Sequence, residues 1–284
     1  KMNMAAVDRA LEALEEVPVP DKITKSAPVP KLIPDGADDF ARKVIEPIMH
    51  FKGNSIPVSS MPDDGRIPTN TAKLEKRGVA ELVPRWLPEN CIQCNQCSFV
   101  CPHAAIRPKQ ILPADLEKAP AKFTTLVSNS RNDKNLRYRL QVYIEDCVGC
   151  GVCVETCPTK EKSLVMVPLE EERAAGENEN VEFFEKLPDS WLDGNKIETV
   201  KGSQFLTPLF EFSGACAGCG ETPYIKLATQ LFGDRMIIAN ATGCSSIYGG
   251  TFPVSPYAKN KEGKGPSWAN SLFEDNAEYG FGMR

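Results

Sequence analysis

The sequence is constrained most by one cysteine spacing that occurs twice. In each run three cysteines lie at every third position, a fourth follows four residues later, and a proline comes directly after it. This spacing is typical of loops that bind 4Fe–4S clusters, because three thiolates of one short loop can hold three corners of a cubane. The first run is Cys91, Cys94, Cys97 and Cys101 with Pro102, and the second is Cys147, Cys150, Cys153 and Cys157 with Pro158.

The fourth cysteine of such a run is expected to point to the neighbouring cluster, so the ligation should be crossed. Two clusters that each take four thiolates have no open coordination position. They suit one-electron transfer and not substrate chemistry. By this rule one cluster is bound by Cys91, Cys94, Cys97 and Cys157, and the other by Cys147, Cys150, Cys153 and Cys101.

Two other interpretations of these cysteines are disfavoured. Structural zinc usually takes two separated cysteine pairs, and four cysteines this close in sequence would be strained as disulfides. Within the loops, Gly149 and Gly151 allow the backbone to approach a cluster closely. Asn95, Gln96 and backbone N–H groups are candidates to donate to sulfur and tune its reduction potential.

Composition excludes several classes of protein. A net charge of −5 without a basic cluster argues against nucleic acid, and no apolar run approaches the roughly 18 residues that cross a bilayer. The eleven cysteines, an odd number in three tight groups, favour reduced, metal-bound thiols in the cytoplasm. Because the chain starts at Lys1, with neither an initiator Met nor a signal peptide, we expect it to be a piece of a longer polypeptide.

Apolar periodicity predicts only short elements before the first cysteine run. A helix is expected over Met2–Glu16, followed by a proline-rich connector up to about Asn70. The connector contains a second helix from Asp39, which Pro47 should end or kink.

Between and after the two runs, a short helix is expected near Ala114–Lys118 and a strand over Leu136–Ile144. The glutamate-rich stretch from Glu170 to Glu185 favours a solvated face or a linker that marks a domain boundary. A basic partner that docks there is the less favoured alternative.

After Phe205 the pattern becomes that of an α/β domain. A helix should begin at Thr222 and end at Gly233, and a short strand should cover Met236–Ala239. Ligands gather beyond the carboxyl ends of strands in such sheets, so the turn at 242–246 is a candidate site.

A third cysteine group lies in this α/β part. Cys216 and Cys219 form a Cys-Ala-Gly-Cys-Gly-Glu motif, and Cys244 follows some 25 residues later. Three ligands do not complete a 4Fe–4S site. No cysteine follows Cys244, and His103 is favoured as a packing or surface residue, so a fourth ligand is expected beyond Arg284.

Five motifs together resemble pyruvate:ferredoxin (flavodoxin) oxidoreductases. The resemblance covers nearly the whole chain and is most specific after Glu75. It implies an α+β fold: the tail of an α/β domain with a connector over 1–70, a bacterial two-cluster ferredoxin-like domain over 71–188, and the start of an α/β thiamine diphosphate-binding domain over 189–284. The motifs are EKRGVA at 75–80, NCIQCNQC at 90–97, CPH at 101–103, CAGCGE at 216–221 and ATGCSSIY at 241–248.

The resemblance also implies a function, namely oxidative decarboxylation of pyruvate with coenzyme A to acetyl-CoA and CO2, with electrons passed to ferredoxin or flavodoxin. It assigns Cys216, Cys219 and Cys244 to a third 4Fe–4S cluster and places Glu221 and Cys244 near thiamine diphosphate. Mg²⁺ would accompany the thiamine, and we expect a homodimer. The chain departs from the family's needs because it has no Gly-Asp-Gly motif for the magnesium diphosphate.

Three alternatives stay open. The chain could be a stand-alone two-cluster electron carrier whose last 80 or so residues serve docking. It could belong to a relative that acts on another 2-oxo acid, or be a zinc-stapled interaction scaffold.

Overall fold

A computed structural model describes residues 2–22, 32–130, 133–190, 196–271 and 275–284. The chain divides into two compact units, Lys1–Lys31 and Leu32–Arg284. The first unit contains helix α1, Met2–Glu12, which confirms the expected N-terminal helix although it ends four residues earlier than predicted. Its Met2, Met4 and Val7 side chains are exposed.

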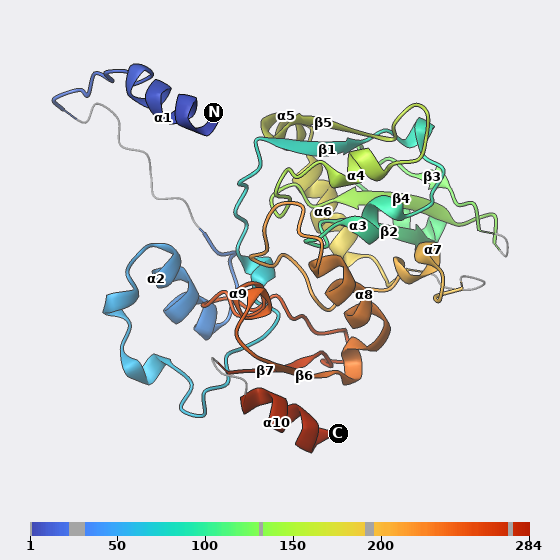
Figure 1. The fold of residues 1–284 in the computed structure, drawn as a ribbon. Coiled ribbons are helices and arrows are strands. Elements are labelled where there is room, and N and C mark those ends of the chain that lie inside the picture. The colour runs from blue at the N-terminus through green and yellow to red at the C-terminus, as the bar shows by residue number, and fades with distance from the viewer. Residues whose placement is uncertain (1, 23–31, 131–132, 191–195, 272–274) are drawn as a thin grey trace. The chain divides into compact units, whose positions relative to one another are not determined.

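The second unit combines two antiparallel sheets with a parallel pair of strands (Figure 1). The antiparallel sheets have the orders β1-β5 and β2-β4-β3, and β6 pairs with β7 in parallel. The strands are β1 Leu82–Trp86, β2 Ile106–Ile111, β3 Leu126–Val127, β4 Arg137–Val142, β5 Leu164–Pro168, β6 Ile237–Asn240 and β7 Ser267–Asn270. The α-helices are α2 Glu46–Met49, α3 Gln96–Val100, α4 Val152–Thr156, α5 Leu169–Ala174, α6 Glu177–Lys186, α7 Val200–Ser203, α8 Thr222–Phe232, α9 Cys244–Gly249 and α10 Asp275–Met283.

The duplicated cysteine runs fold as duplicated structure. Helices α3 and α4 each have five residues, and they contact each other. Each begins after a left-handed residue and ends directly before the last cysteine of its run, Cys101 or Cys157. The predicted strand at Leu136–Ile144 is confirmed as β4, whose fully buried Leu140 packs in the core beneath these helices together with Val83 and Leu164.

The proline-containing helix of the connector continues past its proline. Residues 39–49 are helical, and Ala41–Ile45 form a π-helical turn directly before α2. The N–H of Glu46 bonds to the carbonyl of Ala41, so the widened turn accommodates Pro47, which cannot donate and would crowd a regular helix. The prediction that Pro47 ends the helix is wrong, whereas a local distortion is confirmed.

Two other expectations need correction. The short helix near Ala114–Lys118 is a 3₁₀ turn at Pro113–Leu116. The glutamate-rich stretch is not a linker, because it forms helices α5 and α6 and its acidic side chains pair with arginines of the cysteine-bearing part. Glu172 accepts from Arg85 at 2.6 Å, and Glu177 accepts from Arg139 at 2.7 Å.

The α/β character of the last part is confirmed. Helix α8 has Pro223 in its first turn, β6 follows it, and β6 and β7 run parallel with Ile237 opposite Ser267. The candidate turn at 242–246 follows the carboxyl end of β6 and leads into α9. No helix among the described residues is long and apolar enough to span a membrane.

The Arg139–Glu177 pair offers a test of how the glutamate helices stabilise the fold. Glu177 accepts from both Arg139 and Gln141, and the Arg139 side chain is only 5% exposed. In Glu177→Ala the guanidinium stays buried without its carboxylate, so the free energy of unfolding should fall by about 3–5 kcal/mol in urea denaturation followed by circular dichroism.

Glu179→Ala is the matched control, because Glu179 lies in the same first turn of α6 and is exposed. It should change the free energy of unfolding by less than about 0.5 kcal/mol. Equal losses in the two variants would contradict a specific role for the buried pair.

Candidate metal centres

The first of two small cavities gathers cysteines from both runs. Tyr138 and Ser163 line it beside the thiols. Its cysteines are Cys91, Cys94 and Cys97 from the first run and Cys157 from the second.

The second cavity shows the reciprocal arrangement. Pro84, His103 and Val152 are among its other lining residues. Its cysteines are Cys147, Cys150 and Cys153 from the second run and Cys101 from the first. Each cavity therefore receives three thiols from one loop and the last thiol of the other, which is the grouping that crossed ligation requires.

The loops need four left-handed residues at matching places. Gln93 and Asn95 have φ of 57° and 61°, and Gly149 and Gly151 have φ of 69° and 74°. The second loop uses glycine, for which this region carries no steric penalty. The first loop uses polar residues that are held in place by hydrogen bonds from their side chains.

Those hydrogen bonds anchor the first loop to its surroundings. Asn95 donates to the carbonyl of Lys201 at 2.8 Å and accepts from the Tyr138 hydroxyl at 2.8 Å. Gln93 donates to the carbonyl of Val127 at 2.8 Å and accepts from the N–H of Asn129 at 2.9 Å. The Asn95 amide thus stabilises the loop instead of donating to sulfur, which corrects the expectation for this residue.

Sulfur receives hydrogen bonds from other groups. The N–H of Gly149 donates to Cys147 Sγ at 3.4 Å. Cys157 Sγ lies 3.1 Å from the Thr159 hydroxyl and 3.2 Å from the Ser163 hydroxyl. Burial raises the pKa of Cys157, but these hydroxyls and nearby backbone N–H groups outweigh it and bring the value to about 7.

The other buried thiols resist ionisation without a metal. Burial raises the pKa of Cys147 to about 12 and raises those of Cys97 and Cys153 further. Iron ligation supplies the positive charge that a buried thiolate requires. The donor set of each cavity therefore fits a 4Fe–4S cluster, one thiolate for each iron.

A single metal ion fits less well. Among the described residues no three or more His, Cys, Asp or Glu side chains converge as they would around one ion. A cubane is larger and needs thiolates that are spread around it.

The third cysteine group lies at the surface of the described structure. Cys216 and Cys244 are exposed and Cys219 is partly buried. Cys216 and Cys219 lie in the loop before α8, and Cys244 begins α9. Among the described residues these three thiols do not converge as they would around one ion, so their ligation of a shared cluster stays a prediction.

The loop of the third group passes close to the second cavity. A Cβ built on Gly218 would lie 3.8 Å from Cys150 Cβ and 3.6 Å from Val152 Cγ2. His103, which is 2% exposed and lines the second cavity, lies with Nδ1 3.1 Å from the carbonyl of Ser213. The expectation that His103 is a packing residue is confirmed.

Glu221, the other predicted cofactor-binding residue, is exposed directly before α8. Burial and then the Glu221 carboxylate raise the pKa values of Tyr248 and Tyr257. Tyr248 lies on α9, four residues after Cys244. The acidic side chain therefore faces the part of the structure that carries Cys244.

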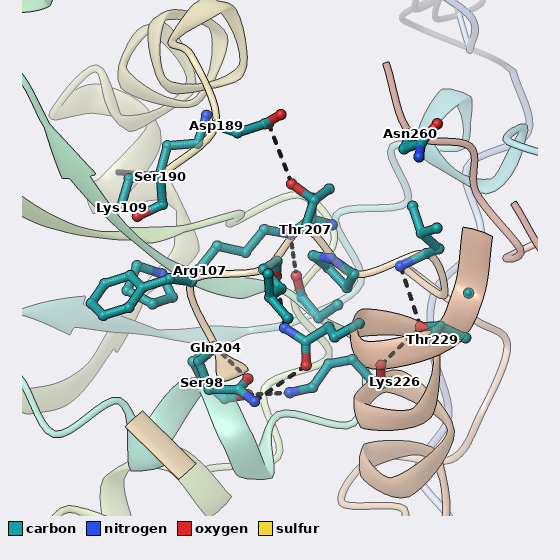
Figure 2. A pocket seen from close by; sticks show the side chains of 18 of the residues that line it. Ser98, Arg107, Lys109, Asp189, Ser190, Gln204, Thr207, Lys226, Thr229 and Asn260 are labelled. Atoms are coloured by element: carbon teal, nitrogen blue, oxygen red, sulfur yellow. Dashed lines mark hydrogen bonds between the residues drawn. The ribbon is translucent and has the colours of Figure 1, made fainter. Parts of the chain in front are cut away.

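A larger cavity of about 500 Å³ lies between the cysteine-bearing part and α8 (Figure 2). Its inner cations already have partners: Arg107 donates to Glu211, and Lys109 donates to the carbonyls of Phe184 and Leu187. Lys226 extends from α8 toward Ser98. These cations are not predictable from the sequence, because their spacing on a helix or strand is that of ordinary surface residues.

Comparisons with known proteins agree with the cysteine pattern. Residues 90–161 match a family described as a 4Fe-4S dicluster domain. Residues 25–80 match a family, EKR, that is described as a domain of unknown function.

Whole-length similarity is also high. The chain is 57% identical over 282 residues to the pyruvate:ferredoxin oxidoreductase of Moorella thermoacetica, covering 99% of this chain and 24% of that protein. It is 53% identical over 289 residues to the pyruvate-flavodoxin oxidoreductase of Rhodospirillum rubrum, covering 99% and 24%. It is 48% identical over 300 residues to that of Nostoc sp., covering 100% and 25%. The chain thus spans about a quarter of the length of the curated relatives it matches.

Two glycines of the second loop give a matched test of the loop geometry. A Cβ on Gly149 would lie 2.8 Å from the Leu82 carbonyl oxygen, whereas a Cβ on Gly151 would meet nothing within 4 Å. Gly151→Ala should cost only the strain of a left-handed alanine, about 1–2 kcal/mol. Gly149→Ala should also displace backbone, and so should lose more bound iron and sulfide and lower the thermal midpoint further. Equal iron content in the two variants would contradict the close approach at Gly149.

Proposed function

Because the chain corresponds along its whole length to a segment of the pyruvate:ferredoxin and pyruvate-flavodoxin oxidoreductases, we propose that it is the electron-transfer part of such an enzyme. The complete protein would oxidatively decarboxylate pyruvate with coenzyme A to acetyl-CoA and CO2. The electrons would pass through 4Fe–4S clusters to ferredoxin or flavodoxin. The observation that carries this proposal is the pair of cavities, each lined by four cysteines from both loops.

The cysteines hold the clusters and the surrounding residues keep water away. We assign Cys91, Cys94, Cys97 and Cys157 to one cluster and Cys101, Cys147, Cys150 and Cys153 to the other. When bound, such clusters accept and release single electrons without binding substrate. Tyr138, which is 1% exposed, and Pro84 cover the cavities with protein atoms.

The α/β segment supplies a third set of residues. Cys216, Cys219 and Cys244 are proposed ligands of a third cluster, with the fourth ligand elsewhere in the complete protein. Glu221 and Cys244 would lie near thiamine diphosphate and its Mg²⁺. The contact between Gly218 and Cys150 supports this order of sites, because it brings the third group close to the second cavity.

Domain limits follow the same proposal. They are a connector to about residue 70, a two-cluster domain over 71–188 and the start of the thiamine diphosphate domain from 189. The 4Fe-4S dicluster match at 90–161 lies within the proposed two-cluster domain and supports it. A homodimer is proposed for the complete protein.

Serine substitutions test the assignment in the intact parent enzyme. Cys94→Ser and Cys150→Ser each remove one proposed ligand from one cavity. Pyruvate-dependent reduction of ferredoxin should fall by about tenfold or more. Even the loss of a residue that only orients a metal ligand costs about 10–100-fold in metal affinity or activity. Decarboxylation of pyruvate, measured as isotope exchange with CO2, should stay detectable. Equal loss of both activities would count against a role in electron transfer.

Glu155→Ala is the control, since Glu155 lies between Cys153 and Cys157, is exposed and lines neither cavity. It should retain both activities. Loss of ferredoxin reduction in this variant would show that the cysteine run tolerates no change, and the serine variants would then say nothing about ligation.

The mass of the native polypeptide tests the context. An antibody against residues 91–157 should detect a denatured band several times heavier than the 31.2 kDa of this chain. A band near 31.2 kDa, with about eight irons unchanged by Cys244→Ser, would instead support a stand-alone two-cluster carrier.

A further inference from the structure

One buried lysine from the α/β segment caps a helix that carries cluster-site cysteines. Lys226 Nζ donates to the carbonyls of Ser98, of Phe99 at 3.0 Å and of Cys101 at 3.3 Å. These carbonyls form the C-terminal end of α3, where the backbone carries partial negative charge. Figure 2 shows the Lys226 side chain extending from α8 to this point.

The second cysteine helix has a lysine at the equivalent position. Lys162 Nζ donates to the carbonyls of Glu155 at 3.2 Å and of Cys157 at 2.7 Å. In the duplicated runs Phe99 corresponds to Glu155 and Cys101 to Cys157. The same two carbonyls thus accept from an ammonium group at both helices, although one lysine comes from α8 and the other from the loop after α4.

The two lysines differ in exposure. Lys226 is 2% exposed, whereas Lys162 is partly exposed. Among the described residues no carboxylate forms an ion pair with Lys226, so its charge is balanced only by carbonyl dipoles. Three carbonyl acceptors use all three N–H donors of an ammonium group, whereas a neutral amine has only two.

We propose that Lys226 is a positioning residue that raises the reduction potential of the cluster bound by Cys101, Cys147, Cys150 and Cys153. The inference rests on the proposed cluster assignment. One-electron reduction adds one negative charge to a site that already carries four thiolates. A fixed cation in the protein interior attracts that charge more strongly than it would in water, and it stabilises the reduced state over the oxidised state.

The partly exposed Lys162 should affect its cluster more weakly. Water and salt screen a partly exposed ammonium, so Lys162 should shift the potential of the cluster that includes Cys157 by less. The buried cation therefore favours reduction at the second cavity, which is the one that lies close to Gly218 of the Cys216–Cys219 loop. Helix α8 begins directly after that loop, so one segment carries Cys216, Cys219 and the charge.

The test uses the intact parent enzyme, purified without oxygen, in a reductive titration followed by electron paramagnetic resonance. Lys226→Met removes the charge at similar side-chain length, and Lys226→Arg retains it. We expect the midpoint potential of one cluster to shift to a more negative value in Lys226→Met and to stay near the wild-type value in Lys226→Arg. Lys162→Met should cause a smaller negative shift.

The outcomes separate electrostatics from simple structural support. If Lys226→Met lowers the thermal midpoint but leaves every cluster potential unchanged, the proposal is wrong. If Lys226→Met loses iron and cannot be titrated, Lys226→Gln replaces it, because this neutral side chain still donates to carbonyls; unchanged potentials in Lys226→Gln overturn the proposal.

The titration does not depend on pyruvate turnover. A shifted potential in a protein that fails to oxidise pyruvate would support the role of Lys226 and reject the proposed enzyme. Normal pyruvate oxidation with unshifted potentials would reject the role of Lys226 and support the proposed enzyme.

Discussion

The last cysteine of each run lies in the cavity formed by the other run, and the rest of the second unit depends on this exchange. Neither loop can complete its own set of four thiols, so Cys101 and Cys157 require both loops to be present and correctly oriented. The antiparallel pairs β1-β5 and β2-β4 connect the two halves across the core. Val83 on β1 and Leu164 on β5 are fully buried, and their two strands pair with each other. This pairing fixes the loops more firmly than the short helices α3 and α4 could alone.

Cations around this core have two kinds of partner. The Arg107 and Arg139 side chains, which are 12% and 5% exposed, pair with the carboxylates of Glu211 and Glu177. A buried pair contributes little net stability, but an unpaired buried charge is costly. Among the described residues both Lys109 and Lys226 donate hydrogen bonds only to carbonyls, and Lys226, at 2% exposed, is the more buried of the two. Its burial therefore needs a reason other than an ion pair. Attraction to a cofactor that becomes more negative on reduction supplies such a reason.

Sequence spacing predicts the features that depend on local chemistry. The cysteine runs, strand β4, helix α8 and strand β6 all follow from periodicity and motif spacing, because each is specified within a few residues. The helices and ion pairs of the glutamates in α5 and α6 are not predictable in this way, because their partners, such as Arg85 and Arg139, lie far away in sequence. Likewise, nothing local distinguishes Lys226 from a surface lysine. Its partners are more than 120 residues distant.

The same long-range contacts explain why the α/β segment is more than an appendage to the cysteine-bearing part. Arg77 donates to the carbonyl of Phe212 at 3.2 Å, and the N–H of Phe212 donates to the carbonyl of His103 at 2.9 Å. In each of these contacts, as in those of Lys226 and Gly218, at least one partner contributes a backbone atom. Backbone contacts are insensitive to most side-chain changes, so they hold the loop of Cys216 in a fixed place beside the second cavity. The proposed electron transfer between the second cavity and the third cysteine group would need a constant separation, which these contacts can keep without a particular side chain at most positions.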